Sequence, residues 1–202
     1  MSEGLKPTAS ELEFLVELAT RLGATAASVI PASGIVVEDR LADFCRKPRC
    51  ENYGQSAKCP PHIGGPAEYR ELLKQFTTAV VFKIDVPSDI LLSAERREVF
   101  RLLHEIAADI EREAIRRGYR FSQAFAGGSC KRAFCNDEPA CRVLTEGGTC
   151  RHPDHARSSM SGYGINVSRL MDLAGWPMKR ITRETDTTEI PMGAISGLVL
   201  IG

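Results

Sequence analysis

The sequence predicts an α+β or α/β fold in which helices cover a single sheet, with two cysteine-rich loops in the connections. Helical and strand-like segments alternate along the chain, and residues 77–86 form an apolar run typical of a central strand. All seven cysteines fall in two short windows between these segments, 45–59 and 130–150. A chain of 202 residues is expected to form one domain, residues 1–202, and to bury about 70% of its unfolded surface.

A helix and two short strands are expected first. Ser10 and Glu13 match a capping box, and Gly23 is a plausible stop for the helix. One face of this helix is apolar: Leu12, Leu15, Val16 and Ala19. Residues 27–38 are expected to form two strands around a Pro-Ala-Ser-Gly turn.

The middle of the chain predicts helix, strand and helix. Pro66 suits a first helical turn, and the strand at 77–86 follows that helix. A long helix is expected from Ser93 to Arg117, ended by Gly118. The apolar stripe of the shorter helix is Tyr69, Leu72, Leu73 and Phe76. The inner face of the longer helix is Val99, Leu103, Ile106, Ile110 and Ala114.

The last expected elements are three strands and one helix. Residues 119–126 alternate as a strand does, with Tyr119, Phe121 and Gln123 on one side. Asn166 is expected to cap a helix. Short strands are then expected at 178–182 and 196–201.

Composition excludes several classes of function. The formal net charge is zero and no long basic tract occurs, which argues against nucleic-acid binding and against a polybasic membrane surface. The apolar stretch at 190–202 is shorter than the roughly 20 residues that span a bilayer. Because no secretory signal precedes the first helix, we expect a cytoplasmic protein.

Disulfides are rare in a reducing compartment, and clustered loop cysteines there are more often metal ligands than core residues. The first window, residues 45–59, reads C-x4-C-x8-C and continues into Pro60-Pro61. The second window, residues 130–150, reads C-x4-C-x5-C-x8-C. Both windows are therefore expected to be metal-binding loops. The expected ligands are Cys45, Cys50, Cys59, Cys130, Cys135, Cys141 and Cys150.

The spacing of the second window favours a [4Fe-4S] cluster over zinc. Four thiolates suit either centre, but zinc sites usually contain pairs two to four residues apart, and this chain has no C-x2-C. Its gaps of four, five and eight are uneven, as in ferredoxins. Nearby glycines would let backbone amides approach cluster sulfides: Gly127, Gly128, Gly147 and Gly148.

The first window has three cysteines, which would leave one iron of a second cluster open. His62 is a candidate fourth ligand, although a histidine in a surface loop more often has no such role. Pro60 and Pro61 would stiffen the loop and shield a metal from water, or would only form a stiff turn. Four cysteines for one cluster and three for the other is the simplest division, but one cysteine can serve the distant cluster.

Further polar residues follow Cys150. Arg157, Ser159 and the helix start at Asn166 form a possible anion or substrate site, unless Arg157 packs along the loop or pairs with an acid. His152 and His155 are either ligands or polar loop residues. On the long helix, His104 is interpreted as a helix-face residue. Its acids are interpreted as a solvated face: Glu105, Asp109, Glu111 and Glu113.

The chain resembles a functionally unassigned family of small cysteine-rich proteins described as predicted metal-binding. The shared motifs begin with Cys45, Cys50, Tyr53-Gly54 and Cys59-Pro60-Pro61. They continue with Gly-Gly-Ser-Cys at 127–130, the later cysteines, and Cys150-Arg151, Arg157, Ser159, Met160 and 164–167. The chain departs from the pattern at Ser158, where a proline is expected. The resemblance covers nearly the whole chain and implies metal binding.

Two functions follow from the cysteine pattern, and the clustering of the cysteines disfavours a third reading, a globular protein whose cysteines bind nothing. The first is an iron–sulfur redox protein with one [4Fe-4S] cluster and possibly a second one. It would act as an electron-transfer accessory or as a reductase, with a redox partner protein or a small-molecule substrate. The alternative is a zinc-stabilised protein-binding module without redox activity.

Overall fold

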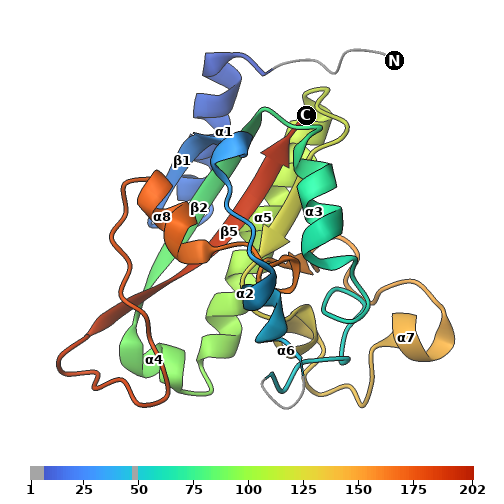
Figure 1. Cartoon of the computed structure of the whole chain (residues 1–202), viewed down its shortest axis with the longest axis vertical. Helices are drawn as coiled ribbons and strands as arrows, with labels where there is room; N and C mark the ends of the chain where they lie inside the picture. The colour runs from blue at the N-terminus through green and yellow to red at the C-terminus, as the bar shows by residue number, and fades with distance from the viewer. Residues whose placement is uncertain (1–6, 47–49) are drawn as a thin grey trace.

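The computed structural model describes residues 7–46 and 50–202, which contain five strands and eight α-helices. The strands are β1 (Ala26–Pro31), β2 (Thr78–Pro87), β3 (Gln123–Ala126), β4 (Ser158–Ser159) and β5 (Met192–Ile201). The helices are α1 (Ala9–Arg21), α2 (Asp39–Asp43), α3 (Gly65–Leu73), α4 (Ser88–Leu92), α5 (Arg96–Arg116), α6 (Cys130–Phe134), α7 (Arg142–Glu146) and α8 (Val167–Leu173). These elements confirm the expected single sheet covered by helices (Figure 1).

The sheet has the order β1-β2-β5-β3-β4. All neighbouring pairs are antiparallel except β3 and β4, which are parallel. On β2, Val80 and Phe82 contribute to one core, whereas Ala79 and Val81 contribute to the other. A strand buried on both faces needs apolar residues at every position, which explains the run seen in the sequence. Phe82 lies over its β5 partner Gly197, where a Cβ atom would stand 2.3 Å from the ring.

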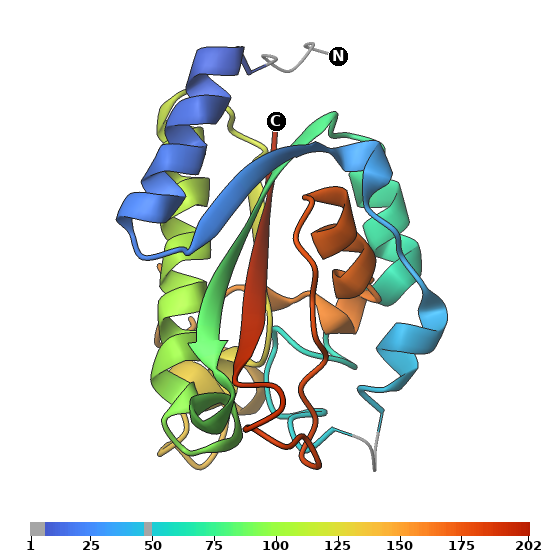
Figure 2. The same cartoon turned by 90° about the vertical axis from the view of Figure 1, so that its left-hand side faces the viewer.

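Helices cover both faces of the sheet. α1 and α5 lie on one side and α3 and α8 on the other (Figure 2). The first core includes Leu15, Leu103, Ile106, Ile110 and Val199. The second core includes Ile30, Tyr69, Phe125, Leu170 and Leu198. Within the described ranges, no helix is long and apolar enough to cross a bilayer.

Two predictions near the beginning of the chain were wrong. The capping box is formed by Thr8 and Glu11, two residues before the expected pair, and Thr8 is the N-cap of α1. After β1 the chain forms a short 3-10 turn, Ala32–Gly34, in place of a second strand. Val37 then makes an isolated bridge to Ile165, which ties this segment to the loop before α8.

Three later predictions also need correction. The long helix begins at Arg96, and the separate helix α4 precedes it, because Ser93 has an extended backbone that ends α4. The strand expected at 119–126 is shortened to β3, and its alternation fails because Phe121 is 65% exposed while Tyr119 is buried. Residues 178–182 lie in an irregular loop between α8 and β5. The cap at Asn166 is confirmed, since its side chain accepts the Arg169 amide.

Candidate metal centre

The segments that carry the cysteines gather at the end of the molecule opposite the chain termini. Loop 50–64, α6 and α7 all lie at this end in Figure 1. Cys130 begins α6, Cys135 ends it, and Cys141 precedes α7. All seven cysteines are free thiols, and Cys59 and Cys130 are buried. The two windows, which are about 70 residues apart in the sequence, therefore share one region of the structure.

Two serine–cysteine contacts join the windows. The hydroxyl of Ser56 lies 3.0 Å from Sγ of Cys130, and Sγ of Cys59 lies 3.4 Å from the hydroxyl of Ser129. All four side chains are buried. Each of these serines stands close in sequence to the cysteine of its own window and contacts the cysteine of the other window. The contacts are thus reciprocal, and they fix the two windows against each other.

The four cysteines of the second window line one small cavity, which we call the thiol cavity. Ser56, Phe134, His152 and Ala156 also line it, and its volume is about 20 Å³. That volume holds about one water molecule or one ion. Apolar packing closes the surroundings, since Cys130, Ala133, Phe134 and Ala156 form a small buried cluster of their own. The sequence-predicted ligands Cys130, Cys135, Cys141 and Cys150 therefore border a common cavity, and their role as ligands stays a prediction.

Burial and neighbouring thiols raise the pKa of several cysteines. Burial is the main cause in each case, and it raises the pKa of Cys45 to about 11 and that of Cys130 to about 12. Burial also raises the pKa of Cys59 and Cys135. Negative charge on neighbouring cysteines adds to the effect: Cys50 and Cys59 act on Cys45, and Cys59, Cys150 and Cys141 act on Cys130. These thiols are protonated at neutral pH unless a positive ion stabilises their thiolates.

The donor chemistry fits a metal that prefers sulfur, because thiols from both windows converge. The geometry is looser than that of a closed ion site. Across residues 7–46 and 50–202, no three His, Cys, Asp or Glu side chains stand close enough to hold one ion. In a zinc–thiolate tetrahedron the sulfurs would be about 3.8 Å apart, given a Zn–S bond of about 2.3 Å. The described cysteines are spread more widely around their common region.

The ring of Phe134 in α6 gathers three of the four histidines. His152 and His155 stack on it, with centroids 5.2 Å and 6.2 Å away, and His104 meets its edge at 5.7 Å. The backbone amide of His152 points to Sγ of Cys150 at 3.4 Å. The side chain of His62, the candidate fourth ligand of the first window, is exposed. The histidines after Cys150 therefore pack around an aromatic ring beside the thiol cavity.

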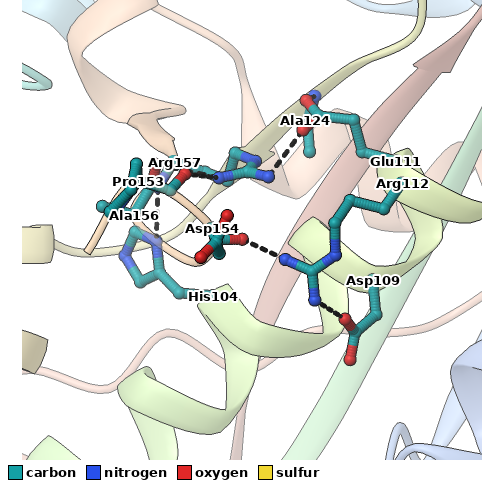
Figure 3. A network of polar contacts seen from close by, with 9 residues as sticks. All are labelled: His104, Asp109, Glu111, Arg112, Ala124, Pro153, Asp154, Ala156 and Arg157. Atoms are coloured by element: carbon teal, nitrogen blue, oxygen red, sulfur yellow. Dashed lines mark hydrogen bonds and ion pairs between the residues drawn. The ribbon is translucent and has the colours of Figure 1, made fainter. Parts of the chain in front are cut away.

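Arg157 pairs with an acid. Its guanidinium lies 2.7 Å from the carboxylate of Glu111 on α5, and both side chains are mostly buried, at 11% and 14% exposed (Figure 3). Its Nη1 also donates to the carbonyls of Pro153 and Ala156. The interpretation of Glu111 as part of a solvated face was wrong, because the loop after Cys150 folds over that turn of α5.

The same network buries His104, which was wrongly interpreted as an ordinary helix-face residue. Its Nδ1 accepts the backbone N–H of Arg157 at 3.2 Å (Figure 3). Burial, with a smaller effect from the Arg157 charge, lowers the pKa of His104 to about 3. Arg112 adds a further tie to this loop through the carbonyl of Asp154. The segment that carries Cys150 is thus fastened to α5 by three side chains.

A second, larger cavity of about 470 Å³ lies next to the thiol cavity and shares Cys150 and Ala156 with it. We call it the outer cavity. Arg157 and Ser158 line it, whereas Ser159 is buried in β4, paired with Ala126 of β3. Of the two residues expected at an anion site, the structure therefore places only Arg157 on this cavity.

A family model described as predicted metal-binding protein (DUF2284) matches residues 28–201. The chain belongs to the DUF2284 family. The match runs from β1 to β5 and includes both cysteine windows, so the family recognised from the motifs is confirmed. No curated protein matches the chain, and no solved structure does.

Four residues of this DUF2284 centre were missed from the sequence. Ser56 and Ser129 had a usable signal, because each stands within three residues of a cysteine in a polar loop. Phe134 also had one, since it is a large aromatic side chain directly before Cys135. Glu111 had none, because its burial depends on where the loop after Cys150 returns to α5.

Proposed function

We propose that this DUF2284 protein is an iron–sulfur redox protein. The four cysteines of the second window would hold one [4Fe-4S] cluster. The three of the first window would hold a second cluster with one open iron. The observation that carries the proposal is the reciprocal pair of contacts, Ser56 with Cys130 and Cys59 with Ser129. These contacts hold the two windows, which together carry seven thiols, against each other, whereas a single zinc uses four.

The chain's own groups suit a buried cluster. Ser56 and the backbone amide of His152 lie within donating range of Cys130 and Cys150, at 3.0 Å and 3.4 Å. Proteins set the reduction potential of a cluster partly through hydrogen bonds to its ligand sulfurs and through the exclusion of water. Such a cluster, when bound, supplies one-electron transfer. The wide spread of the thiols also suits a body larger than one ion.

The partner would be a redox protein or a small-molecule substrate. An electron-transfer accessory needs a cluster that passes electrons to a partner, whereas a reductase needs a substrate site beside it. Free, unpaired thiols suit a reducing compartment, so we place the protein in the cytoplasm. Neither nucleic acid nor a membrane is proposed as a partner.

One observation favours a second candidate, a zinc-stabilised protein-binding module. The thiol cavity, at about 20 Å³, has room for about one ion. A [4Fe-4S] cluster is larger than this cavity. A zinc module would be colourless, would contain no sulfide and would unfold when a chelator removes the metal.

Iron, zinc and acid-labile sulfide should be measured on protein purified without oxygen. Two clusters predict brown protein with about seven to eight irons and matching sulfide. Cys59→Ala should then remove only the first cluster and Cys150→Ala only the second. About four irons, unchanged by Cys59→Ala, would limit the proposal to the second window. One zinc without sulfide would replace it with the binding module.

A further inference from the structure

The outer cavity has the size and position of a substrate site. Its volume of about 470 Å³ lies within the range of pockets that bind small molecules, about 300–1,000 Å³. Cys150 and Ala156 belong to the walls of both cavities, so a molecule in the outer cavity would lie next to a candidate metal ligand. Phe125 and Tyr163, whose rings meet edge to face at 5.5 Å, provide an aromatic wall.

Glu111 is the buried acid of the outer cavity, and both of its carboxylate oxygens already have partners within the protein. One oxygen of Glu111 accepts the backbone N–H of Ala124 at 2.6 Å, and the other contacts Arg157 at 2.7 Å. The negative charge of Glu111 is balanced by Arg157. In the described part of the chain, Nε of Arg157 is buried and lacks a hydrogen-bond partner. The Glu111 carboxylate is therefore paired within the protein, and anion binding depends on the other donors of the wall.

The remaining groups give the cavity an excess of donors and of positive charge. Lys58 lines it with an exposed ammonium group, and none of the acids in the described ranges forms an ion pair with it. Gln123 adds a side-chain amide. Tyr163 also lines the cavity, and burial and the nearby charge of Glu68 raise the pKa of its hydroxyl. Because the charges of Arg157 and Glu111 cancel, Lys58 gives the cavity wall one net positive charge.

We propose that the outer cavity binds a small metabolite through a carboxylate or phosphate group. The anion would accept hydrogen bonds from the Lys58 ammonium and the Gln123 side-chain amide, and the rest of the molecule would lie along the aromatic wall toward Cys150. Only the link to a metal centre rests on the proposed function. The anion site rests on the cavity and its donors alone.

The test is calorimetric titration of the full chain with succinate and with inorganic phosphate, and with neutral succinamide as the uncharged probe. At least one anion should bind and succinamide should not. Lys58→Gln should lower the affinity for the anion about tenfold, which is the effect of losing one charged hydrogen bond. Lys58 is exposed, so this variant should fold. Lys74→Gln is the matched control, because Lys74 is exposed and pairs with Glu71.

The outcomes distinguish a carboxylate ligand from a phosphate ligand. They also distinguish the anion site from the iron–sulfur proposal. Binding of succinate alone would assign a carboxylate ligand, and binding of phosphate alone a phosphoryl ligand. No binding, or equal affinity in Lys58→Gln and Lys74→Gln, would overturn the anion site. Iron and sulfide are measured on the same samples. Anion binding that depends on Lys58 in protein without iron or sulfide would uphold the cavity while the iron–sulfur proposal fails.

Discussion

The hydroxyl of Ser56 lies 3.0 Å from Sγ of Cys130, across 74 residues of sequence. The same hydroxyl oxygen accepts the backbone N–H of Lys58 at 3.0 Å. With its oxygen used as an acceptor, the hydroxyl hydrogen is available for the sulfur. Ser56 thus connects the backbone of the first window to a thiol of the second.

Ser56→Ala should weaken both the fold and the centre. It leaves the N–H of Lys58 without its acceptor, which should lower the free energy of unfolding by about 1–2 kcal/mol. It also removes a donor from the sulfur of Cys130, which should make the reduction potential of a bound cluster more negative. Denaturant unfolding and anaerobic redox titration measure the two effects. Ser10→Ala, at an exposed position of α1, should change neither.

Glu111→Gln should destabilise the protein by about 3 kcal/mol. The substitution keeps an acceptor for Ala124 but leaves the charge of Arg157 buried and unpaired, the costly case for a buried ion pair. Glu105→Gln is the control, since Glu105 is more exposed and pairs with Arg101 within α5 at 3.5 Å. Its effect should stay below about 0.5 kcal/mol. Similar losses for both variants would contradict the buried pair.

The stability of the protein should fall in mild acid because of His104. Burial lowers the pKa of His104 from 6.5 to about 3, so the folded protein keeps the ring neutral while the unfolded chain takes up a proton. The stability contributed by this group is full above about pH 6.5 and is lost as the pH falls toward 3. Between these values the slope should be about 1.4 kcal/mol per pH unit.

His104→Gln isolates this contribution, because a glutamine oxygen can still accept the backbone N–H of Arg157. Denaturant unfolding between pH 7 and pH 4.5, on metal-free protein, should show a shallower pH dependence for the variant, by the slope of one proton. Parallel curves for the two proteins would mean that His104 is protonated in the folded state.

Cys130 should react slowly with iodoacetamide in metal-free protein. Burial raises its pKa to about 12, so very little thiolate is present at pH 7.5. Mass spectrometry of the peptide containing Cys130 should show modification at least about tenfold slower in the folded protein than in urea. Equal rates would show that this thiol is accessible and ordinary.

The periodic segments of the sequence predicted the fold best. Buried runs such as β2, and the apolar stripe of α5 with Leu103, Ile106 and Ile110, depend on local patterns that survive in the structure. The separate helix α4 and the irregular loop at 178–182 were missed, because their conformations depend on packing against other elements. The two cysteine windows could be recognised for the same reason as the stripes, since each window is a local pattern.

Contacts between segments that are distant in the sequence could not be predicted from it. The contact of Ser56 with Cys130, and the pairing of Glu111 with Arg157, join residues that only the completed tertiary structure brings together. Sequence order also could not show that Cys150 lies between two cavities. Such facts are set by the return of the chain to α5 and by the neighbours of β3 in the sheet.

The position of β5 between β2 and β3 sets an order of events during synthesis. β5 follows both cysteine windows in the sequence, yet it supplies the strand that joins the two halves of the sheet (Figure 1). A ribosome has therefore translated all seven cysteines before the sheet that supports them can close. While β5 is still inside the ribosome, the thiols lie on loops that no complete sheet supports. Assembly factors that deliver metal would then meet a finished binding region only after the last strand has emerged.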